Sequence, residues 1–337
     1  MNYFITGGTG FIGTHLAHLL HEVHPEAKIY NLDIVEPGTP LPTVKNYKPA
    51  LRKGEEHAAT FIYCDVRQPI ELEKVNITPD DVIFNFAAVH RTPGHPDSAY
   101  FETNIRGAEN VCAFAERHGI RKMVFTSSIA PYGAAEELKE ETTLPTPNTP
   151  YGISKLVAEK IHQTWQAGGE GRQLTIVRPG VVFGRGENGN FTRLYWGIRG
   201  HKFMYPGRKD TIKACIYVKE LVRFMLYRLE HHDSGVELYN CCYEPAYTIE
   251  HIVESMKRVT NMKVKVPFMP GWLIMTAAGI AGALGSPMGI CPARVRKLQI
   301  STNICGKKLS ASGYRFRYTF EEALADWYKN NGNLYLQ

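Results

Sequence analysis

Three evenly spaced glycines near the start of the chain place the strongest constraint on its fold. Gly7, Gly10 and Gly13 follow a short apolar run at residues 3–5 and lead into a helical pattern over residues 11–20. In such a loop one glycine allows a tight turn, one lets a pyrophosphate approach the backbone, and one lets the helix pack closely on the strand. The free N–H groups at the start of the helix favour phosphate. The segment therefore predicts a strand–loop–helix unit that binds a dinucleotide, with a plain glycine turn as the alternative.

An acidic residue after the second expected strand indicates which dinucleotide. The strand at residues 28–32 ends in Asp33, twenty residues after Gly13. A carboxylate at this point can hold the hydroxyls of the adenine ribose, and it would repel a 2′-phosphate. Residues 34–36 bring no arginine to compensate. The sequence therefore predicts NAD, rather than NADP, as the cofactor.

Strand-like and helix-like segments alternate along the first part of the chain, and the alternation weakens beyond residue 184. This order predicts an α/β protein: a Rossmann-like, doubly wound parallel sheet with a smaller C-terminal α/β substrate lobe. We expect a cofactor domain over residues 1–180 and a mainly substrate-binding lobe over 181–337, with the chain crossing back within 210–245. Further strands are expected at 60–64, 81–86, 122–126, 173–178 and 237–241, and helices at 99–118, 151–166, 219–230 and 249–259. Thr319 and Glu322 have the spacing of a capping box for a last helix.

Composition narrows the class of protein. With 44% hydrophobic and 21% charged residues the chain resembles an ordinary globular protein, and its net charge of +6 is not gathered into a basic stripe, which disfavours nucleic-acid binding. Seven scattered cysteines without a C-x-x-C pair suggest neither a disulfide framework nor a metal site. The start lacks a secretory signal pattern, so we expect a cytoplasmic protein. The apolar run at 272–284 is too short to span a bilayer, and we expect a buried helix there or one that meets a partner subunit or a membrane surface.

A tyrosine and a lysine four residues apart are the strongest candidates for chemistry. Tyr151 and Lys155 would share one face of a helix. A free tyrosine, with a pKa of about 10, is a poor base at neutral pH, but a nearby ammonium favours the phenolate. The preceding strand ends in Thr126, Ser127 and Ser128, at the sheet edge where open α/β sheets bind ligands. Ser128 could then donate to a substrate oxygen whose proton Tyr151 exchanges, although a turn with a local side-chain cap is the alternative for the serines.

These residues resemble those of the extended short-chain dehydrogenases/reductases of the NAD-dependent epimerase/dehydratase group, over about residues 1–230. The resemblance includes the Thr-Gly-x-x-Gly-x-x-Gly loop at 6–13, the Asn-x-x-Gly-x-x-Asn pattern at 104–110 and the Ser-Ser-x-x-x-Tyr-Gly pattern at 127–133. It implies that Ser128, Tyr151 and Lys155 are catalytic, with Lys155 also on the nicotinamide ribose. The cofactor contacts that it implies, together with those from the residues above, are Gly7, Gly10, Phe11, Ile12, Gly13, Asp33, Asp65, Val66, Phe86, Ala87, Ala88, Asn104, Thr126, Tyr151, Lys155 and Pro179.

The same resemblance implies a nucleotide-sugar 4-epimerase-like enzyme that moves a hydride to and from a sugar carbon through a keto intermediate. The related 4,6-dehydratases carry an Asp-Glu pair just after the catalytic hydroxyl, and here Ile129 and Ala130 stand at those positions. A dehydratase is therefore disfavoured. An NAD(H)-dependent ketosugar reductase or a hydroxysteroid-type dehydrogenase remains an alternative within the same chemistry. A non-catalytic NAD-binding sensor is an alternative from another class.

The substrate side departs from the family pattern. Val181 replaces an asparagine that usually lies near the nucleotide-sugar, and Lys213 replaces an arginine that commonly meets the diphosphate. We expect substrate contacts from His90, Asn190 and Lys213. Three further candidates for the phosphates are Arg185, Arg193 and Arg208. The resemblance also implies a homodimer that pairs the helices near 99–118 and 151–166.

Overall fold

The chain is described here by a computed structural model that covers residues 1–39, 49–51, 54–90, 95–233, 235–274, 276 and 299–337. Most of the apolar run expected at 272–284 lies outside the described residues. Along the chain the elements are β1 (Asn2–Thr6), α1 (Phe11–Val23), β2 (Lys28–Asp33), β3 (Thr60–Tyr63), β4 (Val82–Asn85), α2 (Asp97–Arg117), β5 (Lys122–Thr126), a 3-10 turn (Ala130–Tyr132), β6 (Ala135–Lys139), α3 (Pro150–Ala167), β7 (Gln173–Pro179), β8 (Val181–Phe183), α4 (Asn190–Arg199), β9 (Tyr205–Pro206), β10 (Ile212–Lys213), β11 (Cys215–Tyr217), α5 (Val218–Glu230), β12 (Val236–Cys241), β13 (Tyr247–Thr248), α6 (Ile249–Val259), β14 (Phe268–Met269), β15 (Thr302–Ile304), α9 (Lys307–Ala311) and α10 (Phe320–Asn330).

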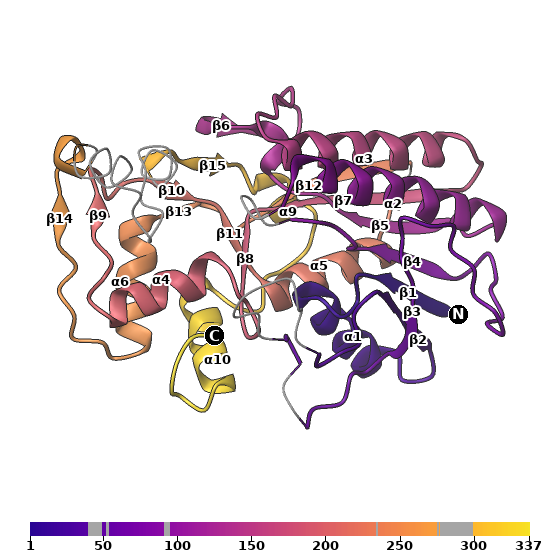
Figure 1. Cartoon of the computed structure of the whole chain (residues 1–337), viewed down its shortest axis with the longest axis horizontal. Helices are drawn as coiled ribbons and strands as arrows, with labels where there is room; N and C mark the ends of the chain where they lie inside the picture. Colours follow the sequence, from indigo (N-terminus) through magenta and orange to yellow (C-terminus); the bar gives the residue numbers. More distant parts are fainter. Residues whose placement is uncertain (40–48, 52–53, 91–94, 234, 275, 277–298) are drawn as a thin grey trace.

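A seven-stranded parallel sheet forms the centre of the molecule, in the order β12-β7-β5-β4-β1-β2-β3 (Figure 1). The chain runs outward from β1 through β2 and β3 on one side and from β4 onward on the other. Ligands of open α/β sheets bind beyond the carboxyl ends of the strands where the order reverses in this way. The crevice between the ends of β1 and β4 is therefore the expected binding site, and it carries the glycine loop.

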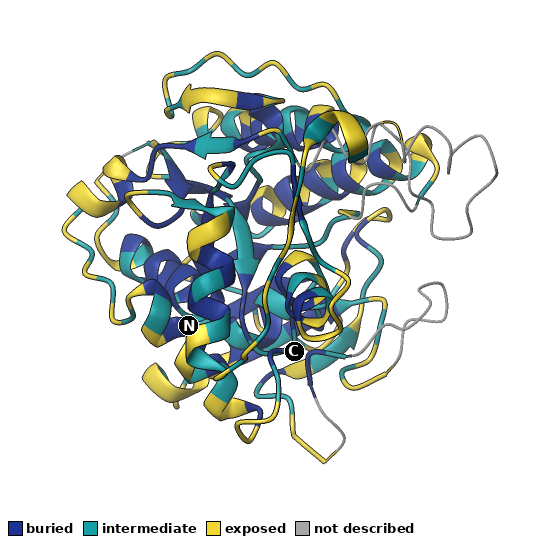
Figure 2. Ribbon diagram, turned by 90° about the vertical axis from the view of Figure 1, so that its left-hand side faces the viewer, coloured by how far each residue is buried: buried dark blue, intermediate teal, exposed yellow. Residues whose placement is uncertain are grey.

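Helices cover both faces of this sheet. On one face α2 and α3 pack side by side over a core that includes Phe4, Ile83 and Phe125 (Figure 1). On the other face α1 and α5 pack over a second core that includes Ile5 and Phe84. Because neighbouring residues of β1 and β4 point into different cores, these strands are buried on both sides, as their unbroken apolar runs require (Figure 2). The doubly wound fold predicted from the sequence is confirmed.

The expected elements agree closely with the observed ones. Each strand predicted in the central sheet lies within one residue of its observed bounds, and the helices predicted at 99–118, 151–166, 219–230 and 249–259 lie within two. The helical pattern at 11–20 continues three residues further, to the end of α1. Thr319 and Glu322 form the predicted capping box at the start of α10. The short strands β6, β10, β13 and β15, which pair with one another as a separate four-stranded sheet, were not predicted. Each of them has only two to five residues, too few to show a period.

A third core lies away from the central sheet, where α4, α6 and α10 gather (Figure 1). It is rich in rings: Phe183 stacks on Phe191 with centroids 4.7 Å apart and meets the edge of Phe320. Between this cluster and the central sheet, β8 pairs in parallel with β11. The next strand along the chain, β12, lies in the central sheet beside β7.

Candidate active site

The glycine loop closes on itself through backbone contacts. The Gly7 N–H donates to Leu32 O at 2.8 Å, and the Gly10 N–H donates to Gly7 O at 3.1 Å. Gly10 is the N-cap of α1. Because glycine has no side chain to accept a hydrogen bond, the first N–H groups of the helix face the loop without a side-chain cap. A Cβ on Gly10 would lie 3.2 Å from Gly7 O, and one on Gly13 would lie 2.5 Å from Gly8 Cα. The cradle therefore exists only because these positions lack side chains, and its shape fits a pyrophosphate.

Asp33 lies at the end of β2, beside this loop. Its carboxylate accepts the Thr9 N–H at 3.1 Å and the Val35 N–H at 3.1 Å. Burial raises the pKa of Asp33, and these backbone hydrogen bonds act in the opposite direction. The residue therefore ties the loop after β1 to the loop after β2, at the place where an adenine ribose would lie.

Asp65 and Val66 follow β3, where the adenine is expected. Both oxygens of Asp65 accept hydrogen bonds from Arg67, the shortest at 2.6 Å, and this contact lowers the Asp65 pKa. Val66 is buried, and its carbonyl accepts the Asn110 side chain at 2.8 Å. A cavity of about 360 Å³ adjoins these residues, lined by Arg67, Gln68, Glu102 and Arg106.

The loop after β4 packs against the glycine loop. A Cβ on Gly7, which has φ +72°, would lie 2.8 Å from Ala87 N. The half-buried residues Phe86, Ala87 and Ala88 thus line the crevice at the expected place. Asn104 does not reach into the crevice with a free amide. Its side chain accepts the Val89 N–H at 2.8 Å and donates to Val89 O and to Ser154 Oγ, so it fixes the loop that leads to the exposed His90.

Ser128, Tyr151 and Lys155 come together at the carboxyl edge of the sheet. The Ser128 side chain acts on Tyr151 and lowers its pKa, and Ser128 Oγ accepts the Ala130 N–H at 3.1 Å. The local cap foreseen as the alternative for this serine is therefore present, and its donation to a substrate oxygen stays a prediction. The helix α3 that carries Tyr151 begins with Pro150 and is capped by Thr149, which accepts the Gly152 N–H.

Burial controls the ionisation of this group. Lys155 is 2% exposed, and its Nζ lies 4.2 Å from the centre of the Phe125 ring. Burial lowers the pKa of Lys155 to about 7, while the charge of Glu159 raises it. Burial raises the pKa of Tyr151, and the Ser128 side chain lowers it. A base at Tyr151 consequently needs a positive charge nearby, and Lys155 supplies one only while it stays protonated.

Thr126 and Pro179 complete the cofactor side. Thr126 is 8% exposed, and within the described residues its Oγ1 has no hydrogen-bond partner. A buried hydroxyl without a partner is costly, so this atom is suited to a ligand group. Pro179 ends β7 two strands from β4. Together with the glycine cradle, the unsatisfied hydroxyl shows that the crevice suits a dinucleotide.

The cations expected on the substrate side are held by protein partners. Lys213 Nζ donates to Ile300 O at 2.7 Å, Arg185 pairs with Glu55, and Arg208 binds Asp210 and Glu136. Asn190, exposed at the first turn of α4, accepts from Arg193 at 3.0 Å. Arg208 also donates to Gln299 O, next to the Ile300 carbonyl that Lys213 contacts, so these two cations lie beside the same segment.

Two residues that the sequence reasoning missed lie directly behind the catalytic group. Glu159 and Arg178 form an ion pair with an Nη2–Oε2 distance of 2.6 Å, and both side chains are almost fully buried. Ser127 donates to the same carboxylate. The spacing of Tyr151, Lys155 and Glu159, four residues at each step, could have indicated that the glutamate shares their helix face.

Comparison with known proteins agrees with this geometry. Residues 3–242 match the NAD dependent epimerase/dehydratase family. The N-acetyl-α-D-glucosaminyl-diphospho-ditrans,octacis-undecaprenol 4-epimerase of Escherichia coli O157:H7 is 30% identical over 331 residues, covering 96% of this chain and 93% of that protein. The UDP-glucose 4-epimerase of Halalkalibacterium halodurans is 29% identical over 299 residues, covering 80% of this chain and 84% of that protein.

Solved structures share the fold at lower identity. The UDP-N-acetylglucosamine 4-epimerase from Methanobrevibacter ruminantium superposes with a TM-score of 0.72 at 22% identity, covering 97% of each chain. The UDP-glucuronic acid 4-epimerase from Bacillus cereus, solved in complex with NAD, gives a TM-score of 0.73 at 18% identity, covering 99% of this chain and 100% of that one. The family is NAD-dependent, which confirms the cofactor predicted from Asp33. The chain belongs to the NAD dependent epimerase/dehydratase family, as the sequence resemblance implied.

Proposed function

We propose that the chain is an NAD-dependent epimerase that inverts a hydroxyl-bearing carbon of a nucleotide-linked sugar. The observation that carries the proposal is the pairing of Tyr151 with Ser128, which lowers the Tyr151 pKa, and with the buried Lys155 one helical turn away. Several relatives, among them the enzymes of E. coli O157:H7 and H. halodurans, carry the name 4-epimerase. No carboxylate follows Ser128, because Ile129 and Ala130 stand there, so an elimination in the manner of the 4,6-dehydratases lacks its acid.

Each residue of the group has a distinct task in this reaction. Bound NAD supplies a reversible acceptor for the hydride of the sugar carbon. Tyr151, as the phenolate, takes the hydroxyl proton while the carbon becomes a ketone, and it returns the proton when the hydride comes back on the other face. Ser128 donates a hydrogen bond to the same oxygen, and Lys155 favours the phenolate through its charge. Lys155 and the glycine loop would hold the cofactor.

The test is a panel of UDP-, dTDP- and GDP-sugars with NAD, in which NMR follows the sugar epimers and absorbance follows NADH. Interconversion of epimers without net NADH formation supports the proposal. Stoichiometric NADH consumption with a ketosugar or ketosteroid would instead identify a reductase or dehydrogenase. Tight NAD binding without turnover of any compound would favour the sensor.

A sugar carried on a polyprenyl diphosphate is the second candidate substrate. The E. coli O157:H7 relative is named for such a compound, and it matches this chain over nearly its whole length. Near the end of the lobe formed by α4, α6 and α10, Phe268, Trp272 and Leu273 are 51%, 72% and 41% exposed. Large exposed apolar side chains of this kind suit contact with a lipid. A direct competition between UDP-N-acetylglucosamine and polyprenyl-diphospho-N-acetylglucosamine in detergent distinguishes the two carriers.

We also infer that the chain forms a homodimer and works in the cytoplasm. The outer side of α3 carries Ile153, which is 40% exposed, and the half-buried Leu156 follows three residues later. An apolar stripe on a surface helix is typical of a helix–helix interface. Within the described residues each cysteine is a free thiol, which agrees with a reducing compartment. No helix among the described residues has the length and apolar character needed to cross a bilayer.

A further inference from the structure

A buried carboxylate connects the two elements that carry the catalytic group to a third, β7. Glu159 is 1% exposed and lies on α3, one turn after Lys155 and two turns after Tyr151. Its Oε1 accepts from Ser127 Oγ at 2.5 Å and from Arg178 Nε at 2.8 Å, and its Oε2 accepts from Arg178 Nη2 at 2.6 Å. The contacts therefore join α3 to the end of β5 and to β7.

Each partner of this carboxylate is adjacent in sequence to a predicted site residue. Ser127 immediately precedes Ser128, and Arg178 immediately precedes Pro179. The Ser127 N–H also donates to Val177 O at 2.8 Å, so the end of β5 is held by its backbone and by its side chain. The Arg178 guanidinium lies 4.7 Å from the centre of the Tyr132 ring, whose hydroxyl donates to Asn240. Arg178 is thus fixed on both sides.

The charged and titratable groups near Lys155 are few. Glu159 acts on it from α3, and Phe125 of β5 presents its ring to the ammonium. His162, one turn beyond Glu159, stacks on Phe125 at 4.0 Å, and burial and the Lys155 charge lower its pKa to about 4, so that it is neutral at pH 7. Tyr151 completes the set. Among these groups, Glu159 is the only negative charge.

We propose that Glu159 is a positioning residue for the reaction: its carboxylate, fixed by Arg178, anchors the Ser127–Ser128 segment and supplies the negative charge that keeps the buried Lys155 ammonium in place behind Tyr151. This inference rests on the proposed epimerase function for its kinetic consequences. A structural ion pair would only hold α3 against β7. A positioning role also changes how Tyr151 and Lys155 ionise.

The expected sign follows from the charges. Without the Glu159 charge the pKa of Lys155 falls further below its ordinary value, so the lysine loses its proton at a lower pH. A neutral lysine no longer favours the phenolate, so the pKa of Tyr151 rises. The pH range over which kcat is high then becomes narrower on both its acid and its alkaline side. A fall of one pKa unit from about 7 lowers the protonated fraction of Lys155 at pH 7 from about one half to about one eleventh, so kcat at pH 7 should fall by about 5-fold while KM changes little.

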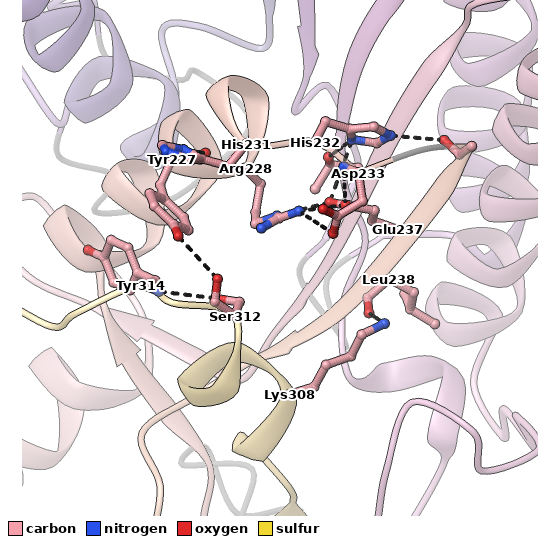
Figure 3. Close-up of polar contacts among 12 residues, drawn as sticks. Tyr227, Arg228, His231, His232, Asp233, Glu237, Leu238, Lys308, Ser312 and Tyr314 are labelled. Atoms are coloured by element: carbon pink, nitrogen blue, oxygen red, sulfur yellow. Dashed lines mark hydrogen bonds and ion pairs between the residues drawn. The ribbon is translucent and has the colours of Figure 1, made fainter.

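The chain contains a matched control pair. Arg228 and Glu237 are also buried, and the guanidinium binds the carboxylate through Nε at 3.0 Å and Nη2 at 2.6 Å (Figure 3). This pair joins α5 to β12, and within the described residues neither side chain forms a hydrogen bond or an ion pair with Tyr151 or Lys155. Arg228 also binds Asp233 at 3.1 Å, so the Glu237→Gln change leaves it one carboxylate. The closer comparison is therefore between the two double variants, in which the glutamate and the arginine of a pair are both replaced.

The experiment compares E159Q and the charge-free double variant E159Q/R178M with E237Q and E237Q/R228M in the full-length protein. Each variant is assayed for Tm and for kcat and KM across pH. Tyrosine ionisation is followed by the ultraviolet absorbance of tyrosinate, and subtracting the titration of the same variant with Tyr151→Phe gives the titration of Tyr151 alone. We expect a narrowed profile and a Tyr151 titration at higher pH in both Glu159 variants and in neither Glu237 variant. Ser127→Ala, which keeps the charge, should lower kcat without narrowing the profile.

Two results would overturn the inference. One is an unchanged Tyr151 titration in a folded E159Q/R178M protein; the other is an equal change in the Glu237 variants. The double variant covers the case in which E159Q alone fails to fold with an unpaired Arg178. Because the tyrosinate titration needs no substrate, an enzyme inactive on every sugar would refute the proposed function and still leave the role of Glu159 testable.

Discussion

Asn104 binds both backbone groups of Val89: its Oδ1 accepts the Val89 N–H at 2.8 Å, and its Nδ2 donates to Val89 O at 3.1 Å. The resemblance implied a contact with the cofactor for Asn104. In addition to that predicted role, its amide holds the backbone of Val89 and donates to Ser154 Oγ. The loop after β4, which lines the crevice beside the glycine loop, is held in shape by this one side chain.

Replacing Asn104 should therefore loosen that loop. In Asn104→Ala the Val89 N–H and C=O lose their partners, which costs on the order of 1–3 kcal/mol. We expect a lower Tm and about a 10-fold rise in the Kd for NAD, measured by calorimetry. Asn2→Ala, which removes an amide bonded to Asn76 O at the opposite end of the sheet, should lower Tm alone. Unchanged NAD affinity in Asn104→Ala would contradict this role for the loop.

Removing the phenol of Tyr151 should abolish turnover while the fold persists. Tyr151→Phe loses the group that exchanges the substrate proton, so we expect kcat to fall by about 10²–10⁴-fold. NMR of the sugar epimers measures the rate, and calorimetry should show NAD binding within a few-fold of the unmodified protein. Tyr227→Phe removes the hydroxyl of a half-buried tyrosine that donates to Ser312 O, far from α3 (Figure 3). This variant should keep the activity of the parent protein. Full activity in Tyr151→Phe would exclude the proposed mechanism.

The Asp33 carboxylate should set the preference for NAD over NADP. Asp33→Asn removes the charge that repels a 2′-phosphate and weakens the acceptor for the ribose hydroxyls. A hydrogen bond to a charged group contributes about 1.5–3 kcal/mol, so the Kd for NAD should rise about 10-fold or more, while the Kd for NADP falls or stays constant. Asp80→Asn, at a site 80% exposed, is the control. A ratio of the two Kd values equal to that of the parent protein would argue against Asp33 as the selector.

Acid should destabilise the chain through its buried histidines. The His162 Nδ1–H donates to Ala158 O, and Nε2 accepts from Asn85, which fits the neutral ring. Burial lowers its pKa from 6.5 to about 4, so between these values the unfolded chain binds the extra proton and stability falls as the pH falls. The shift corresponds to about 3 kcal/mol.

Urea unfolding at a series of pH values between 7 and 4 measures this loss. His162→Gln should flatten the curve over that window, although its stability at pH 7 is lower. The exposed His21 provides the comparison, since His21→Gln should leave the slope unchanged. A slope in His162→Gln equal to that of the parent would show that other groups cause the acid sensitivity.

The outer side of α3 should determine the oligomeric state. A charge at Ile153, in Ile153→Glu, would have to be buried in the proposed helix–helix interface, so we expect a shift from dimer to monomer in light scattering. Leu144→Glu changes a residue that is 79% exposed and should leave the mass unchanged. A monomeric mass for the parent protein would refute the dimer itself.

Local patterns made most of the fold predictable. The glycine loop and Asp33 lie within the first 33 residues, and their spacing alone indicates the turn, the helix start and the cofactor, which the structure and the family confirm. The strands of the central sheet are apolar runs bounded by turn residues, so their bounds could also be predicted. The roles of the site residues, the domain boundary near residue 180 and the dimer remain predictions.

Long-range pairing explains what the sequence could not reveal. Lys213, whose contact with a diphosphate remains a prediction, donates its ammonium to Ile300 O, 87 residues away, and no local pattern indicates this contact. Glu159 meets Ser127 and Arg178 at separations of 32 and 19 residues, and no spacing rule connects them. The strands β10 and β15 have two and three residues, and they form only because distant segments meet. Such contacts depend on the completed fold.

The position of β12 limits how this enzyme can acquire a new substrate. The strand follows the segments that form β8 to α5, yet it completes the central sheet beside β7. The intervening residues therefore leave the central sheet after β7, and the chain returns to it at the neighbouring strand β12. Grafting them from a relative would require two matched junctions and an intact Arg228–Glu237 pair at the return.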